Sequence, residues 1–401
     1  MWLTLVPVLA SAGILLAGSG LLGTLVPIRG RIEGFSPALI GLFGSAFFIG
    51  YMGGCVFGAR IIKRAGHIRA FAALAAIAAS AALFHALSPV PAVWLAARFA
   101  VGFCSAGLSM VIESWLNARA EPGRRGRVLG VYRMVDLGCV TAGQLLLPLV
   151  GPAGFELFAI IAMLYCLALV PVALTREIAP APPEDTRLDL RKVVAISPLA
   201  AAGCVTLGLT NGAFRQVGPL YAEGMGLDLE GIAVFMIAAI VAGALTPIPL
   251  GWLSDRFGRR RVLVLATGAT MLAGLWLSFA VPGEVLLLYA GSFAFGAFAM
   301  PLYSLSIAHA ADRATPADYV MVSAGLLLCF SIGASVGPLV ASLVIERFGA
   351  PYFFTYTSVL HGLLLVYAAW RMATRADPEA RAPFRVFNRT SPEVFRLGKK
   401  K

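Results

Sequence analysis

Residues 251–261 read Gly251-Trp252-Leu253-Ser254-Asp255-Arg256-Phe257-Gly258-Arg259-Arg260-Arg261. Apolar runs flank them on both sides, over residues 230–253 and 261–281. Each run is long enough for a helix that crosses the hydrocarbon of a bilayer, which needs roughly 20 apolar residues. Glycines between two such helices favour a tight turn, arginines stay at the membrane surface, and an aspartate can cap or pair at a helix end. This stretch therefore predicts a short, basic connection between two membrane helices.

The rest of the chain repeats this pattern of apolar runs. Of the 401 residues, 59% are hydrophobic and only 13% are charged, which is more apolar surface than a water-soluble fold can bury. The fold class that follows is an all-α integral membrane protein. We predict twelve transmembrane helices, over residues 4–28, 36–60, 69–88, 91–115, 127–150, 154–174, 195–222, 230–253, 261–281, 285–309, 317–345 and 350–372.

The basic residues are distributed by topology. The chain has a net charge of +12, and most of its 32 Lys and Arg lie in alternate loops and in the tail after Arg371. This is the pattern of the positive-inside rule, which predicts that both termini are cytoplasmic. The basic surplus therefore implies contact with membrane lipid at most, and no nucleic-acid partner.

Enzyme chemistry has no counterpart in the sequence. No nucleotide-binding glycine loop, metalloprotease motif or hydrolase elbow occurs, and no soluble domain is predicted that could hold one. The six cysteines all fall inside predicted spans and have no paired spacing. We therefore expect no enzymatic activity, no cofactor and no metal site.

Two halves of the chain match each other at a nearly fixed offset. A shift of 192 residues brings Arg64 onto Arg256 and Gly66 onto Gly258, as expected for two six-helix repeats. The segment between the halves is polar and rich in proline and charge, which predicts a cytoplasmic linker. We expect an N-terminal six-helix bundle, the linker, a C-terminal six-helix bundle and a basic cytoplasmic tail, over residues 1–174, 175–194, 195–373 and 374–401.

The stretch at 251–261 resembles the signature loop of the major facilitator superfamily, G-x-L-[AS]-D-[RK]-x-G-R-[RK]. The residues that carry the resemblance are Gly251, Asp255, Arg256, Gly258 and Arg259. The corresponding loop of the first half departs from it, because Lys63 stands where the aspartate belongs. Two further stretches, residues 98–106 and 113–118 with 125–127, are similar to an element of the superfamily's fourth helix and to a poorly characterised bacterial subgroup.

The resemblance implies the major facilitator fold and secondary active transport of a small solute by alternating access. It also implies a monomer in the bacterial inner membrane that is coupled to protons. Since no ATP-binding motif occurs, the energy for transport is expected to come from an ion or solute gradient. Export of lipophilic drugs stays open beside proton-linked movement of an organic anion in either direction, although the G-P ending of helix 5 that many drug antiporters have is missing after Gly143. A non-transporting receptor or scaffold of the same fold is a further alternative.

Ionisable residues inside predicted spans are candidates for function, because they cost several kcal/mol unless they face a partner or water. Arg133 and Asp136 are three residues apart on helix 5 and can pair, and Gln144 follows on the same face. Glu113 lies at a similar depth on helix 4. We expect this polar face to turn to the opposite half or to a water-filled cleft. The cluster then acts as a gate of salt bridges or as a proton-coupling site.

Two arginines near the outer ends of predicted spans suggest a substrate site. Arg98 on helix 4 and Arg215 on helix 7 each lie about seven residues inside the outer end of a predicted span, which corresponds to about 10 Å. Asn211 precedes Arg215 by one turn. Guanidinium groups bind carboxylate or phosphate through paired hydrogen bonds, so that these three residues suit an anionic substrate. The alternative for Arg98 is the structural or coupling role that its motif implies.

Overall fold

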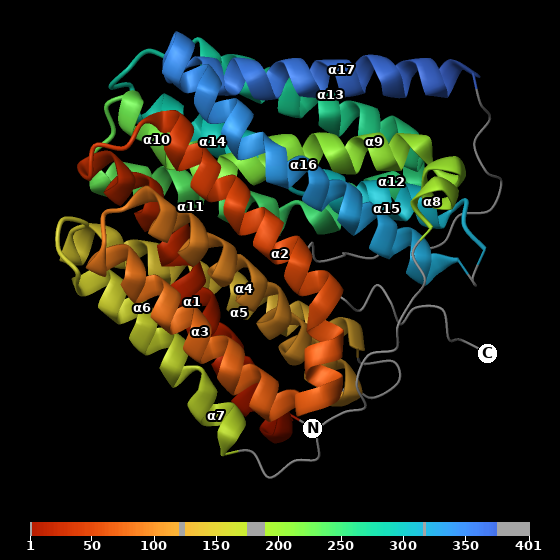
Figure 1. Cartoon of the computed structure of the whole chain (residues 1–401). Coiled ribbons are helices and arrows are strands. Elements are labelled where there is room, and N and C mark those ends of the chain that lie inside the picture. The colour runs from red at the N-terminus through yellow and green to blue at the C-terminus, as the bar shows by residue number, and fades with distance from the viewer. Residues whose placement is uncertain (1, 120–124, 175–188, 316–317, 375–401) are drawn as a thin grey trace. The chain divides into compact units, whose positions relative to one another are not determined.

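The computed structural model describes residues 2–119, 125–174, 189–315 and 318–374, and every regular element within them is a helix (Figure 1). The chain divides into two compact units, which we call unit 1 and unit 2. Unit 1 contains α1 to α7 and unit 2 contains α8 to α17. The predicted fold class of two helical bundles is therefore confirmed.

Unit 1 is built from long helices that pack in pairs. α2 packs along α4, α1 along α5, and α3 against α4 and α6. Its fully buried side chains include Trp94, Trp115, Tyr165 and Phe158, which form the apolar interior. The helices are α1 (Trp2–Ile32), α2 (Pro37–Ala65), α3 (His67–Leu87), α4 (Pro91–Arg119), α5 (Arg125–Val150), α6 (Glu156–Leu167) and α7 (Leu169–Ala173).

Unit 2 repeats these pairs, with α11 along α14 and α13 along α17. Several of its helices are broken into shorter segments. They are α8 (Leu190–Ile196), α9 (Pro198–Leu207), the π-helical turn η1 (Gly208–Gly212), α10 (Ala213–Gly224), α11 (Leu229–Leu245), α12 (Pro247–Phe257), α13 (Arg259–Ser278), α14 (Val285–Ala299), α15 (Leu302–Ala311), α16 (Tyr319–Phe348) and α17 (Tyr352–Thr374).

The predicted membrane spans are found, some of them bent. Ten helices of the described chain are long and apolar enough to cross a bilayer, and the number rises to twelve if each of two bent pairs counts as one span. α11 and α12 are bent by 40°, and α8 meets the helix that follows it at 110°. The predicted span over 195–222 therefore begins only at Pro198, after Ser197 has ended α8 and capped α9 with its hydroxyl oxygen.

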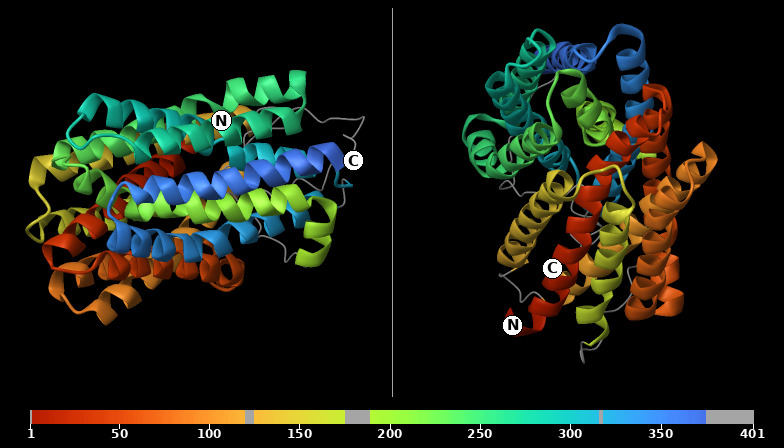
Figure 2. Two further views of the ribbon diagram at one scale, coloured as in Figure 1. Left: turned by 90° about the horizontal axis from the view of Figure 1, so that it is seen from above. Right: turned by 90° about the vertical axis from the view of Figure 1, so that its left-hand side faces the viewer.

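α8 crosses the end of α9 where a linker is predicted (Figure 2, left). The linker prediction falls on residues 175–188, outside the described residues, and its last part is helical from Leu190. Lys192 of α8 donates to Asp318 at 2.7 Å, which lowers the pKa of that carboxyl, and the Thr315 hydroxyl adds to the effect. This contact ties α8 to the start of α16. The predicted basic tail lies outside the described residues.

Two glycines at equivalent places in the repeat form the tight turns that the sequence predicts. Gly66 ends α2 with φ of 81°, and Gly258 ends α12 with φ of 99°. Both angles lie in the left-handed region, where a side chain would clash with the backbone. The two turns confirm that residues 64–66 and 256–258 are structurally equivalent.

Glycines also bring helix backbones into direct contact. A Cβ on Gly102 of α4 would overlap the carbonyl of Phe47 on α2, and one on Gly296 of α14 would overlap the carbonyl of Ala239 on α11. Small residues allow this close approach, which is how helices associate where water provides no driving force. Gly333 of α16 approaches the carbonyl of Val205 on α9 in the same way.

We expect Gly102→Ala to lower the free energy of unfolding by about 1–3 kcal/mol, since the added methyl forces α2 and α4 apart. Gly138 provides the matched control, because it is a helical glycine of α5 with open space around it. Gly138→Ala should be neutral or stabilising by up to about 1 kcal/mol. Thermal unfolding of both detergent-solubilised proteins measures the difference, and equal melting temperatures would contradict the packing described.

Candidate functional site

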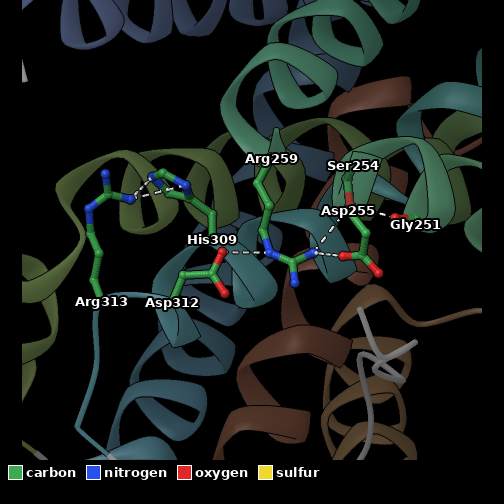
Figure 3. A network of polar contacts seen from close by, with 7 residues as sticks. All are labelled: Gly251, Ser254, Asp255, Arg259, His309, Asp312 and Arg313. Atoms are coloured by element: carbon green, nitrogen blue, oxygen red, sulfur yellow. Dashed lines mark hydrogen bonds and ion pairs between the residues drawn. The ribbon is translucent and has the colours of Figure 1, made fainter. Parts of the chain in front are cut away.

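The signature loop forms a network of polar contacts around Arg259 (Figure 3). The Arg259 side chain is only 3% exposed, and its Nη1 lies 3.0 Å from Asp255 Oδ1. Its Nε lies 2.6 Å from Asp312 Oδ2, and that carboxylate is 5% exposed. Nη1 also donates to Ser254 Oγ at 3.1 Å, and this hydroxyl donates to the Gly251 carbonyl. One buried guanidinium therefore joins the end of α12, the start of α13 and the end of α15.

The network explains why the loop needs its residue types. Asp255 and Arg259 are four residues apart across the turn that Gly258 makes, so that their side chains meet on one side of it. Arg256 points elsewhere: it is exposed and stacks on Trp252 at 5.5 Å. Asp312 is a partner that the sequence pattern does not predict. It lies 53 residues beyond Arg259, and no motif links the two.

The equivalent turn of unit 1 has a histidine contact instead. His67 stands where Arg259 stands in unit 2, and it begins α3 directly after Gly66. Its Nε2 lies 3.0 Å from Ser114 Oγ, and its ring packs on Trp115 with 5.7 Å between centroids. The Ser114-Trp115 pair of the predicted subgroup motif therefore holds α4 to the turn before α3. The two units keep one turn geometry and differ in the charge that it contains.

Glu113 and the α5 pair gather around Tyr132. Glu113 is 1% exposed on α4. Arg133 and Asp136 form an ion pair on α5, as their spacing predicts, with side chains 41% and 18% exposed. Tyr132 is buried within electrostatic reach of both carboxylates, and Cys55 of α2 lies within reach of Glu113. The structure therefore brings the predicted cluster into one region, in which Glu113 is the buried member.

The part of the predicted α5 face around residues 140–144 packs against a different neighbour than expected. Val140 of this face packs against Gly20 of α1, and Gly143 approaches the carbonyl of Ala17. Gln144 is 3% exposed, and its Oε1 has no hydrogen-bond partner among the described residues. This part of α5 therefore faces α1 of its own unit, and the expectation that the whole face turns to the opposite half or to water is wrong for it. Packing of small residues decides its orientation.

Arg98 lies inside unit 1. It is 1% exposed, and its guanidinium stacks over the ring of Phe47 at 4.8 Å. Tyr165 of α6 and His85 of α3 lie within electrostatic reach of it. A guanidinium over an aromatic face is held by a cation–π contact, which suits the structural role that its motif implies. Its contact with substrate stays a prediction.

Asn211 and Arg215 belong to a distorted part of unit 2. Asn211 lies in the π-helical turn η1 and is fully buried, and its Nδ2 donates to the Ala299 carbonyl at 3.0 Å. That carbonyl belongs to the end of α14, where the helix breaks before α15. Arg215 is exposed, whereas the residues beside it on α10 are buried. Single π-helical turns occur often at functional sites, and this one was not predicted.

No group of three or more His, Cys, Asp or Glu side chains in the described ranges is placed to hold a metal ion. The arginines and carboxylates of the candidate site can bind an anion, exchange a proton or form ion pairs.

The sequence matches one protein family over most of its length. The family model described as Major Facilitator Superfamily matches residues 8–248 and again 241–398. Two relatives, each named "Uncharacterized MFS-type transporter YcaD", come from Escherichia coli O6:K15:H31 (strain 536 / UPEC) and O9:H4 (strain HS). Each is 27% identical over 330 residues, which are 82% of this chain and 85% of the relative.

Solved structures show the same fold. The nucleoside transporter NupG superposes with a TM-score of 0.79 over 92% of this chain and 98% of its own, at 14% identity. A bacterial homologue of the human lysosomal transporter Spinster superposes with a TM-score of 0.72 over 94% and 98%, at 16% identity. At these identities the likeness concerns the fold alone.

Proposed function

Since this chain belongs to the major facilitator superfamily and is a multi-pass membrane transporter rather than an enzyme, we propose that it moves a small organic anion together with protons. Alternating access of the two six-helix halves is the mechanism that this architecture suits. The coupling energy comes from an ion gradient in this proposal. The protein acts as a monomer in the bacterial inner membrane with both termini in the cytoplasm, as the positive-inside pattern favours.

The observation that carries the substrate class is the exposed Arg215. Its neighbours on α10 are buried, so that the segment turns this one cationic side chain away from the interior of unit 2. The π-helical turn one helical turn earlier holds Asn211 against the end of α14. An arginine presented on a rigid element recognises a carboxylate or phosphate through two parallel hydrogen bonds. Arg98, packed on Phe47 in unit 1, is a further substrate residue in this proposal.

The carboxylates of unit 1 take two different roles. Asp136 is ion-paired with Arg133 and partly exposed, which favours a gate whose salt bridge opens and closes. Glu113 is buried beside Tyr132, which favours a site that alternates between a charged and a neutral form as water reaches it. Gln144, buried on α5, supports the gate as a polar group in this proposal.

Arg215→Ala tests the substrate class. In liposomes, the rate at which the purified Arg215→Ala protein takes up the anion should fall by at least about tenfold relative to the wild type, because one charge-assisted hydrogen bond contributes roughly 1.5–3 kcal/mol. Arg347→Ala removes an exposed arginine from the end of α16 and should leave uptake unchanged. A thermal-shift screen against anionic metabolites and cationic drugs identifies the anion beforehand.

The same screen separates the alternatives. If Arg215→Ala leaves uptake of every tested anion unchanged, the anion proposal is wrong. Stabilisation and export of lipophilic cations alone would place the protein among proton-linked drug exporters instead. Binding of a solute without any movement of it across the liposome membrane would indicate a receptor of the same fold.

A further inference from the structure

A small cavity lies beside the network of Figure 3, at the end of unit 2 that contains the signature loop. It is lined by residues 197–199 at the start of α9 and by Arg260, His309, Arg313 and Arg371. Among the described residues, every ionisable side chain in this lining is basic. We call it the basic cavity.

The side chains at the floor of the basic cavity are buried, and those at its rim are more exposed. Arg260 and His309 are 4% and 3% exposed, whereas Arg313 and Arg371 are half-buried. Arg313 Nη1 donates to His309 Nε2 at 2.7 Å, and a guanidinium can only donate, so that the imidazole nitrogen accepts. His309 therefore orients Arg313 at the rim of the cavity.

The acidic side chains of the neighbouring network are engaged elsewhere. Asp255 and Asp312 both contact Arg259, and neither lines the basic cavity. The start of α9 adds further positive character, because Ser197 caps the helix and the amide of Leu199 lies in its first turn. The N-terminus of a helix attracts anions through such amides and through the helix dipole. Charges from four helix ends therefore converge on one small space.

Aromatic residues place this end of unit 2 at a membrane surface. Trp370 is 56% exposed beside Arg371, whose guanidinium stacks on it at 5.9 Å. Trp252 is 59% exposed beside Arg256 in the signature loop. Exposed tryptophans next to arginines are typical of the level of lipid headgroups. The free volume of about 10 Å³ holds at most one water-sized group, so that a larger ligand can bind only at the rim.

We propose that the basic cavity binds a single phosphate group at its rim, between Arg313 and Arg371. The phosphate belongs to the headgroup of an anionic lipid or to a soluble phosphate, and both offer the oxygens that guanidinium groups bind in pairs. This site is separate from Arg215, so that its failure leaves the proposed substrate class untouched.

Arg371→Ala tests the site in the full-length, detergent-solubilised protein. Phosphatidylglycerol should raise the melting temperature of the wild type, and phosphatidylcholine should not. In Arg371→Ala we expect the apparent affinity for phosphatidylglycerol to fall by at least about tenfold. Arg371→Lys keeps the charge but not the paired hydrogen bonds and should fall between the two. Arg347→Ala, with the same loss of charge at the end of α16, should match the wild type.

Inorganic phosphate distinguishes the sources. Stabilisation by phosphate without lipid, or displacement of phosphatidylglycerol by it, shows that soluble phosphate occupies the site. Stabilisation by phosphatidylglycerol alone shows that the site takes a lipid headgroup. The proposal is overturned if neither probe stabilises the wild type, or if Arg371→Ala and Arg347→Ala respond alike.

Discussion

The Arg259→Ala protein will unfold with a free energy about 3–5 kcal/mol below that of the wild type, the cost of breaking a buried ion pair by removal of one partner. Arg259 is 3% exposed and contacts Asp255 and Asp312 from one guanidinium. Its loss leaves the Asp312 carboxylate, 5% exposed, without the guanidinium that now compensates its charge. Thermal and denaturant unfolding of the detergent-solubilised protein measure the change.

Two further variants locate the effect. Arg256→Ala removes an exposed arginine from the same loop and should change the free energy of unfolding by no more than about 0.5 kcal/mol. The double variant Arg259→Ala with Asp312→Ala should recover part of the loss, because no buried charge is left behind. Equal destabilisation by Arg256→Ala and Arg259→Ala would mean that the loop contributes through its net charge and not through the buried network.

The second large effect concerns coupling. We expect Glu113→Gln protein in liposomes to lose accumulation driven by a proton gradient and to keep exchange of solute across the membrane. Glutamine has the size of glutamate but cannot take up or release a proton. Glu113 is the buried carboxyl of the cluster, and the described groups within electrostatic reach of it include Tyr132 of α5 and Cys55 of α2. Uptake with and without a pH gradient, and counterflow at equal pH, separate the two activities.

Asp136→Asn is the matched control for Glu113→Gln. It removes the charge that Arg133 pairs with, at a partly exposed position. A gate residue changes the rate of transport, so that uptake by this variant should keep its full dependence on the pH gradient. If Asp136→Asn loses that dependence and Glu113→Gln keeps it, the two carboxylates have the opposite roles.

The sequence predicted the bundles and their repeat well, because bilayer thickness imposes a length on every apolar run and the loops carry repeated glycines. Gly66 and Gly258 show this most directly, since both adopt the turn that their motif requires. The breaks within helices were not predicted. Ser197-Pro198 is a helix-start signal inside an apolar stretch, and hydropathy alone does not register it. The π-helical turn leaves no pattern in hydropathy either, since it changes hydrogen-bond spacing and not polarity.

The candidate site was predictable where its contacts are local. Arg133 and Asp136 pair as their spacing of three residues on a helix requires. The Arg259–Asp312 contact joins residues far apart in the sequence, and only the packing of α13 against α15 brings them together. The part of α5 around Gly143 was assigned to the wrong neighbour, because a polar stripe that also contains small residues suits close helix packing as well as water.

The turn η1 determines the rotation of α10 about the helix axis relative to α9. An α-helix advances by about 100° per residue, and a π turn contains one residue more than an α turn. If Gly208–Gly212 adopted regular α geometry with no residue removed, α10 would be rotated by about 100° relative to α9. Arg215 would then turn from its exposed side toward the crowded interior. The inserted residue therefore sets the phase of the helix that presents the cationic side chain.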